Sequence, residues 1–161
     1  MTQADFSREM AAVRIELDDL LRGASDSMLR EPRIYGEWSC ADVLAHFAGY
    51  TRGVADGLAR ARGSRANSPA YGAPPGLSDD DFNAVVVDYW RQRPISELLE
   101  EERDAFRALM TEVEDLEPAT LTAAGVFQFL GFKSLESILP GNGYRHYREH
   151  MPALIEALQS S

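Results

Sequence analysis

The sequence predicts an all-α protein, an antiparallel four-helix bundle with long connections. Apolar residues recur at steps of three and four in four long segments, and this spacing places them on one face of each helix. One apolar run resembles a strand, residues 126–132, but it has no second strand to pair with. We therefore expect it to be a connector that covers one end of the bundle. A chain of 161 residues suits a single domain, expected over residues 1–161.

The first helix is expected from residue 5 to about residue 22, and Gly23 is a natural stop after it. Its apolar residues follow the helical spacing: Phe6, Met10, Val13, Leu17 and Leu20. Residues 24–38 mix Ser, Asp, Pro and Gly without a sustained period. They predict a long connection, with a helical turn around residues 26–29.

The second helix is expected from residue 40 to about residue 62. Ser39 and Asp42 have the spacing of a capping box, with Asp in place of the usual Glu. The apolar face consists of Val43, Phe47, Tyr50, Val54 and Leu58. His46 lies at the border of this face. Residues 63–77 then contain three prolines and three glycines, and a loop of this length is often a lid or a binding element.

The third helical region begins at Ser78, because a serine cap followed by three aspartates suits the positive end of a helix dipole. Pro94 interrupts this helix, since proline lacks a backbone donor. A helix starts or restarts at Ser96 and is expected to reach about residue 116, where Pro118 ends it.

The last helical segment is expected to begin at Ser134 and to reach about residue 158. A Pro-Gly-Asn-Gly stretch, residues 140–143, lies inside it and predicts a kink or a break. The break falls immediately before a histidine pair, His146 and His150, which the final part of the segment carries.

Composition excludes several classes of protein. The net charge of −10 argues against a nucleic-acid-binding protein, which needs a clustered basic surface. No apolar run reaches the roughly 18 residues of a membrane span, so no membrane partner is expected. The first residues lack the basic start and apolar block of a secretion signal. Cys40 is the single cysteine, so no internal disulfide can form, and a cytoplasmic location is expected.

Three histidines form the candidate site. His146 and His150 are four residues apart, which places them one helical turn apart on the same face, with β-carbons about 5–6 Å apart. With His46 from the second helix, they can converge on a single divalent metal between packed helices. Three protein nitrogens leave a fourth position open for water or substrate, as in catalytic zinc sites. A histidine considered alone is more often a hydrogen-bonded core residue or a surface residue than a metal ligand, and a metal site is indicated only by all three together.

Residues 38–50 resemble a family signature. The stretch from Trp38 to Tyr50 is similar to the W-[ST]-x-x-D-[VL]-[LI]-x-H-[LI] pattern that opens the second helix of DinB-like four-helix-bundle proteins. That superfamily includes the metal-binding domain of mycothiol-dependent maleylpyruvate isomerase and related thiol transferases. The resemblance implies His46, His146 and His150 as the metal ligands. It also implies a homodimer and, as cofactors, a divalent metal (zinc or nickel first, iron or manganese as alternatives) with a low-molecular-weight thiol.

The function expected from the site and the resemblance is that of a metal-dependent enzyme. It would transfer a thiol to a small electrophilic molecule or hydrolyse that molecule. Tyr50 or Tyr147 could line the pocket and donate a hydrogen bond near the metal. The alternative is a small-molecule-binding or resistance protein similar to the ClbS/DfsB branch, without an essential metal. A further alternative is a reactive Cys40 thiol at the start of the second helix.

Overall fold

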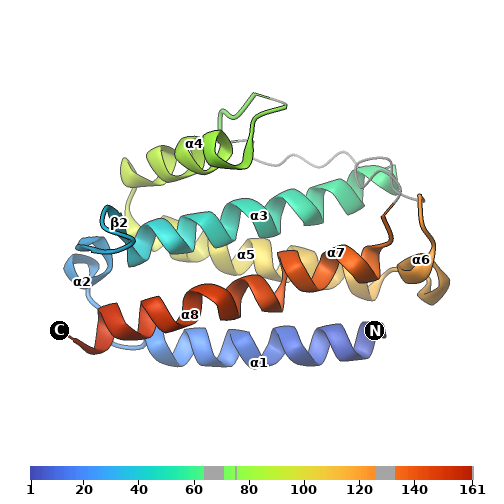
Figure 1. Cartoon of the computed structure of the whole chain (residues 1–161), viewed down its shortest axis with the longest axis horizontal. Helices are drawn as coiled ribbons and strands as arrows, with labels where there is room; N and C mark the ends of the chain where they lie inside the picture. Colours follow the sequence, from blue (N-terminus) through green and yellow to red (C-terminus); the bar gives the residue numbers. More distant parts are fainter. Residues whose placement is uncertain (64–70, 75, 126–132, 161) are drawn as a thin grey trace.

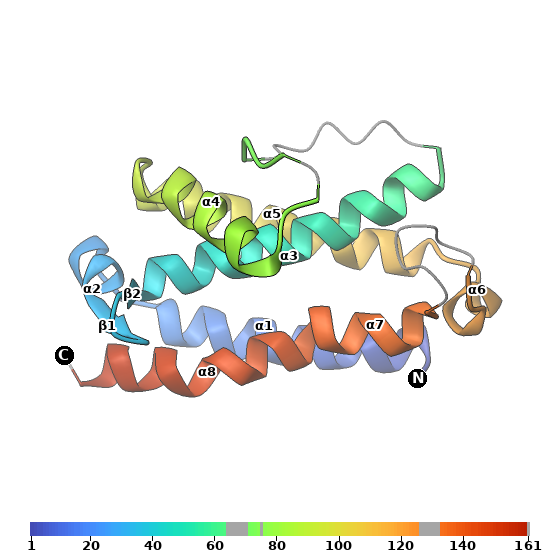
Figure 2. The same ribbon diagram turned by 45° about the horizontal axis from the view of Figure 1, so that its top comes forward.

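Helices make up most of the residues that the computed structural model describes, which are 1–63, 71–74, 76–125 and 133–160. The predicted all-α helical bundle is confirmed. Its long helices lie side by side in Figures 1 and 2: α1 (Gln3–Leu21), α3 (Cys40–Ala61), α5 (Ile95–Glu114) and the consecutive pair α7 (Leu135–Asn142) and α8 (Tyr144–Gln159). Within the described ranges, no helix is long and apolar enough to cross a membrane.

The order of the helices includes one return along the outside of the bundle. The short helix α4 (Asp79–Arg91) packs against α3 and leads back toward the end where α3 began. As a result α5 runs in the same direction as α3, whereas α1 and α8 run in the opposite direction (Figure 1). A small helix, α6 (Pro118–Thr122), follows α5 at the far end. This return places α4 against the first half of α3, where His46 lies.

The start of α3 is anchored by the predicted capping box. The Asp42 backbone N–H donates to Ser39 Oγ at 3.2 Å, and the Ser39 backbone N–H donates to Asp42 Oδ2 at 2.9 Å. The buried Asp42 carboxylate also accepts two hydrogen bonds from Arg91 at the end of α4, at 3.0 and 2.9 Å. Because charge-assisted, two-point contacts of this kind are strong and directional, they fix α4 against α3.

The connection before α3 contains a hairpin that the sequence did not indicate. After α2 (Asp26–Arg30), two short antiparallel strands form, β1 (Pro32–Ile34) and β2 (Trp38–Ser39). Strands this short carry too few residues for an alternating pattern to be recognised. The turn between them places Tyr35 at φ 51° and Gly36 at φ 83°, both in the left-handed region.

The predicted break in the last segment lies at Gly143, between α7 and α8. The backbone of Gly143 approaches its neighbours closely. A β-carbon there would lie 2.8 Å from the Leu139 carbonyl oxygen, 2.9 Å from Phe6 Cε2 and 3.0 Å from Met10 Sδ. Glycine at this position therefore allows the α7–α8 junction to sit directly on α1.

Replacing Gly143 with alanine is expected to lower the free energy of unfolding by about 1–3 kcal/mol, the usual cost of inserting a methyl group into a packed site. Urea denaturation of the variant measures the loss. Gly141→Ala is the matched control, because a β-carbon at Gly141 meets nothing within 4 Å. Equal stabilities of the two variants would contradict the close approach at Gly143.

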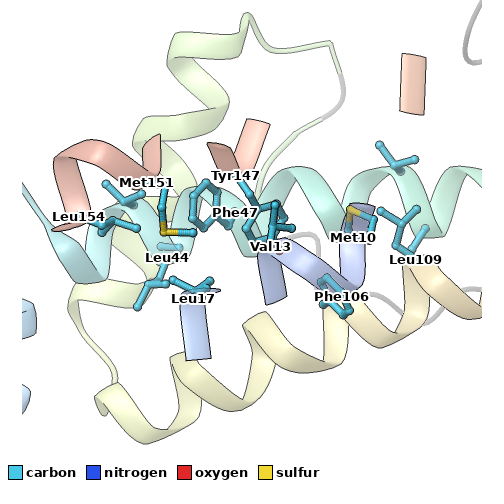
Figure 3. Close-up of a cluster of buried hydrophobic side chains, with 14 of the residues drawn as sticks. Met10, Val13, Leu17, Leu44, Phe47, Phe106, Leu109, Tyr147, Met151 and Leu154 are labelled. Carbon is cyan, nitrogen blue, oxygen red and sulfur yellow. The ribbon is translucent and has the colours of Figure 1, made fainter. Parts of the chain in front are cut away.

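The core lies along the middle of the bundle, where all the long helices contribute apolar side chains (Figure 3). The labelled residues of this cluster are Met10, Val13, Leu17, Leu44, Phe47, Phe106, Leu109, Tyr147, Met151 and Leu154. Phe47 stacks on Tyr147 with ring centroids 4.3 Å apart, which joins α3 to α8. The stacking places the residues next to Tyr147 along α8 close to α3.

A buried polar network crosses this core. The Glu102 side chain, 1% exposed, accepts a hydrogen bond from Arg14 Nη1 at 2.5 Å and one from the Tyr147 hydroxyl at 2.9 Å. The Tyr147 hydroxyl is also 3.4 Å from Thr51 Oγ1. One side chain from each of α1, α3, α5 and α8 therefore takes part. Such a network fixes the rotation of α8 about its axis, because its partners must all be satisfied at once.

Two expected features fall mainly outside the described residues. Most of the long loop at 63–77 and all of the connector at 126–132 belong to the parts of the chain that the structure does not describe. Their proposed roles as a lid and as a cover for the bundle stay predictions, as does the assignment of the whole chain to a single domain.

Candidate metal centre

Three imidazole rings meet in the space between α3 and α8. His46 comes from α3, and His146 and His150 come from successive turns of α8. One ligand nitrogen from each ring lies within 4.8 Å of those of the other two. The ring centroids are 4.5 Å apart for His46 and His146, 5.0 Å for His46 and His150, and 5.1 Å for His146 and His150. Residues separated by a hundred positions in the chain are thus brought to one point.

His46 is buried and held by a hydrogen bond from α4. The residue is 7% exposed, and its Nδ1 lies 2.8 Å from Asn83 Oδ1. Since a carbonyl oxygen can only accept, His46 Nδ1 carries the proton and Nε2 presents a lone pair. The rings of Trp38 and Tyr50 lie against the imidazole, with centroids 5.5 and 4.8 Å away. The sequence placed His46 at the border of the apolar face, and the addition of α4 buries it.

His150 is held from the hairpin between β1 and β2. Its Nδ1 lies 2.9 Å from the Tyr35 hydroxyl, and the two rings are in edge contact with centroids 5.9 Å apart. His146 has a different environment, because its buried Nδ1 has no hydrogen-bond partner among the described residues. Packing against Phe47 and Tyr50, at 5.5 and 5.3 Å between centroids, sets the orientation of its ring.

The three histidines favour the neutral form. Burial, with the nearby rings of His46 and His150, lowers the pKa of His146 to about 3. Burial also lowers the pKa of His46, although the Asn83 hydrogen bond opposes it, and lowers the pKa of His150 against the effect of Glu149. Neutral imidazole is the form that binds metals, so no proton has to be displaced at neutral pH.

The donor set fits a divalent metal of the zinc, nickel or iron type. Hydrogen bonds to Nδ1 of His46 and of His150 leave Nε2 of both rings available, which is the usual arrangement of metal-binding histidines. Nε2 of His146 points at Nε2 of His46, 2.6 Å away. Three neutral nitrogens, with no carboxylate among them, match the preferences of these metals rather than those of magnesium or calcium.

The other residues named from the sequence lie in different places. Tyr50 lies beside the histidines and also lines a pocket. Tyr147 is fully buried, and its hydroxyl donates to Glu102. Its position is therefore one in the core rather than in a pocket wall. Cys40 is buried, with 1% of the residue exposed, so a substrate cannot reach its thiol as a nucleophile.

Asn83 and Tyr35 are the functional candidates that sequence reasoning missed. Both hold the outer nitrogen of a histidine, and both come from elements whose position depends on tertiary packing. Tyr35 had one indirect signal, the Gly36 that follows it, which marks a turn. The positive φ of Tyr35 costs free energy, because Tyr35 is not a glycine, and residues in such conformations cluster at functional sites.

Comparison with known protein families places most of the chain in one of them. Residues 10–129 match the mycothiol maleylpyruvate isomerase N-terminal domain. The chain belongs to this family. The membership confirms the resemblance to the DinB-like superfamily. The matched residues include His46 and Asn83 but end before α8, so they do not include His146 and His150. Comparisons with curated proteins and with solved structures gave no match.

Removing the hydrogen bond to His46 is expected to weaken metal binding by about 10–100-fold, the usual effect of losing a group that orients a ligand. Asn83→Ala tests this, with Zn²⁺ affinity measured by competition against a fluorescent chelator. Tyr35→Phe should have a similar effect through His150. Gln92→Ala, an exposed position just after the same helix α4, is the control. Unchanged affinity in both Asn83→Ala and Tyr35→Phe would show that neither group orients a ligand.

Proposed function

We propose that the chain is a metal-dependent enzyme that transfers a low-molecular-weight thiol to a small electrophile or hydrolyses that electrophile. The observation that carries this proposal is the convergence of three neutral imidazoles from two helices. A divalent metal would be held by His46, His146 and His150, and the three protein ligands would leave a position open. When bound, the metal would lower the pKa of a thiol or a water and so supply a nucleophile at neutral pH.

The side chains around the histidines prepare the site. Asn83 and Tyr35 hold the outer nitrogens, which keeps the inner nitrogens of His46 and His150 aimed at one point. The rings of Trp38, Phe47 and Tyr50 surround the imidazoles. Aromatic walls displace water and lower the local dielectric, which strengthens the influence of any charge on the reacting groups. The chain thus contributes orientation and exclusion of water.

The family name supports a thiol as the second reactant, because it refers to an isomerase that uses mycothiol. Zinc or nickel is proposed as the metal, with iron or manganese as alternatives. A homodimer and a cytoplasmic location complete the proposal. The alternative, a small-molecule-binding protein without an essential metal, gives no reason for three histidines to converge with their outer nitrogens held.

The test combines metal analysis with an activity assay. We expect the purified protein, after exposure to Zn²⁺ or Ni²⁺ and removal of the excess, to hold close to one metal ion per chain by mass spectrometry. The loaded protein should accelerate the reaction of mycothiol with 1-chloro-2,4-dinitrobenzene, or the hydrolysis of 4-nitrophenyl acetate without thiol. His46→Ala should reduce both metal content and rate to background. A protein that takes up no metal yet retains a small molecule would contradict the proposal and favour the binding alternative.

A further inference from the structure

An apolar pocket lies beside the histidine cluster, between α3, α4 and α7. Its volume is about 210 Å³. A buried apolar cavity of about 150 Å³ can hold benzene, so this pocket has room for an aromatic ring or a group of similar size. The walls include Gly49, Tyr50, Gly53, Phe82, Ile138 and Asn142. A β-carbon at Gly53 would meet nothing within 4 Å, so glycine leaves space open there, whereas a β-carbon at Gly49 would lie 3.1 Å from Val86 on α4.

The pocket and the histidines are neighbours along the same two helical segments. Tyr50 follows His46 by four residues on α3, which is about one turn, and Asn142 is the last residue of α7, the helix before the one that carries His146. The Tyr50 ring contacts the rings of both histidines, at 4.8 and 5.3 Å between centroids. A molecule in the pocket is therefore separated from the cluster by one side chain.

Acidic side chains lie next to the pocket, at the start of α4. The first turn of this helix contains Asp79, Asp80 and Asp81, directly before Phe82 in the pocket wall. Asp80 also lines a neighbouring hollow together with Asn83, the hydrogen-bond partner of His46. Carboxylates beside the pocket wall would repel a negatively charged ligand.

No basic side chain lines the pocket in the described part of the chain. Arg91 on α4 binds the Asp42 carboxylate through two nitrogens, and Arg148 on α8 binds Glu9 at 2.7 Å. Both guanidinium groups are thus engaged away from the pocket. Proteins usually recognise carboxylates through arginine in a two-point contact, and this pocket offers none.

We propose that this pocket binds the uncharged, apolar part of the electrophilic substrate, and that the site selects against substrates that carry a carboxylate. The inference rests on the proposed function, because the reactive end of the substrate would reach the histidine cluster. Maleylpyruvate, from which the family takes its name, is a dicarboxylate. This chain would therefore act on a different class of substrate from the one in the family name.

Two matched probes test the charge preference. 1-Benzylimidazole and 4-(imidazol-1-ylmethyl)benzoate differ by one carboxylate, and each carries an imidazole as a potential ligand for the metal. Both are titrated into Co²⁺-loaded and metal-free protein. Binding is followed by visible absorption and by the backbone amide NMR signals of Gly49 and Gly53, with Gly23, which lies after α1 and outside the pocket wall, as the reference. We expect about tenfold tighter binding of the neutral probe, which corresponds to about 1.4 kcal/mol of repulsion.

Three variants test the position of the bound group. Gly53→Leu should fill the pocket without a clash at Cβ, since a β-carbon there meets nothing within 4 Å. This variant should bind 1-benzylimidazole at least about tenfold more weakly, and its affinity for unsubstituted imidazole should be unchanged. Gly141→Leu, another helical glycine with open space around it, is the control and should change neither. Asp80→Asn should reduce the difference in affinity between the neutral probe and the benzoate probe.

The pocket assignment and the metal-dependent function can be contradicted independently of each other. Equal or tighter binding of the benzoate probe, or equal effects of Gly53→Leu and Gly141→Leu, would overturn the pocket assignment. Shifts of Gly49 and Gly53 by the neutral probe in a protein that binds no Co²⁺ would support the pocket and contradict the metal-dependent function. Binding of the probe to Co²⁺ without shifts of these two glycines would support the metal site and contradict the pocket assignment.

Discussion

The His146→Ala protein is expected to bind divalent metal at least 100-fold more weakly than the unaltered protein. Losing a group that only orients a ligand lowers the metal affinity about 10–100-fold, so losing one of the three ligands should lower it by more. His146 is also the ring closest to His46, with the two Nε2 atoms 2.6 Å apart. Its removal would leave two nitrogens from different helices and no pair on α8.

Chelator competition measures the affinity directly, and stability gives a second readout. A ligand present at 100 times its dissociation constant stabilises the folded state by about 2.7 kcal/mol. Adding EDTA should therefore lower the melting temperature of the metal-loaded protein and leave that of His146→Ala unchanged. Arg145→Ala, an exposed neighbour on α8, serves as the control and should keep both the metal and the EDTA response. Equal metal affinity of His146→Ala and Arg145→Ala would remove His146 from the ligand set.

Replacing Glu102 with alanine is expected to lower the free energy of unfolding by about 3 kcal/mol, because it removes the buried partner of Arg14, which keeps only its contact with Asp18 at 2.7 Å. The Arg14 side chain is 13% exposed and loses its contact with Glu102 at 2.5 Å. The Tyr147 hydroxyl, which is fully buried, loses its acceptor at 2.9 Å. Both consequences act at the centre of the bundle, where water cannot replace the missing carboxylate.

Controls separate the network from a general effect of substitution on α5. Glu100→Ala, an exposed glutamate of the same helix, should change stability by no more than about 0.5 kcal/mol in urea denaturation. The double variant Arg14→Met with Glu102→Leu should recover most of the loss, because apolar replacement of a buried pair is often neutral or stabilising. A single-variant loss no larger than that of Glu100→Ala would show that Glu102 carries no buried charge in the folded state.

Local patterns predicted much of the bundle. The capping residues Ser39 and Ser78 mark the starts of α3 and α4 within one residue, because a cap acts on the backbone N–H groups two or three positions along. The break at 140–143 was equally readable, and it lies at Gly143. The spacing of His146 and His150 put both on one face of α8. Their meeting with His46 was also predicted, whereas metal binding by the three stays a prediction.

Features that depend on packing between distant segments were not readable from the sequence. Asn83 looks like an ordinary polar residue on α4 until the return of that helix brings it to His46. Tyr35 becomes relevant only because a short hairpin turns it toward α8. Glu102 is one of several glutamates on α5, and its burial beside Arg14 follows from the rotation of that helix in the bundle. Each of these contacts joins residues far apart in the chain, and no local spacing encodes such a contact.

Anomalous diffraction from crystals of the Zn²⁺-loaded protein, recorded on both sides of the zinc absorption edge, tests the three-histidine metal site most directly. We predict one strong peak per chain, within bonding distance of a nitrogen from each of His46, His146 and His150, with room for a further ligand. A peak at another place, or zinc bound by fewer than two of these rings, would contradict the assignment of the site.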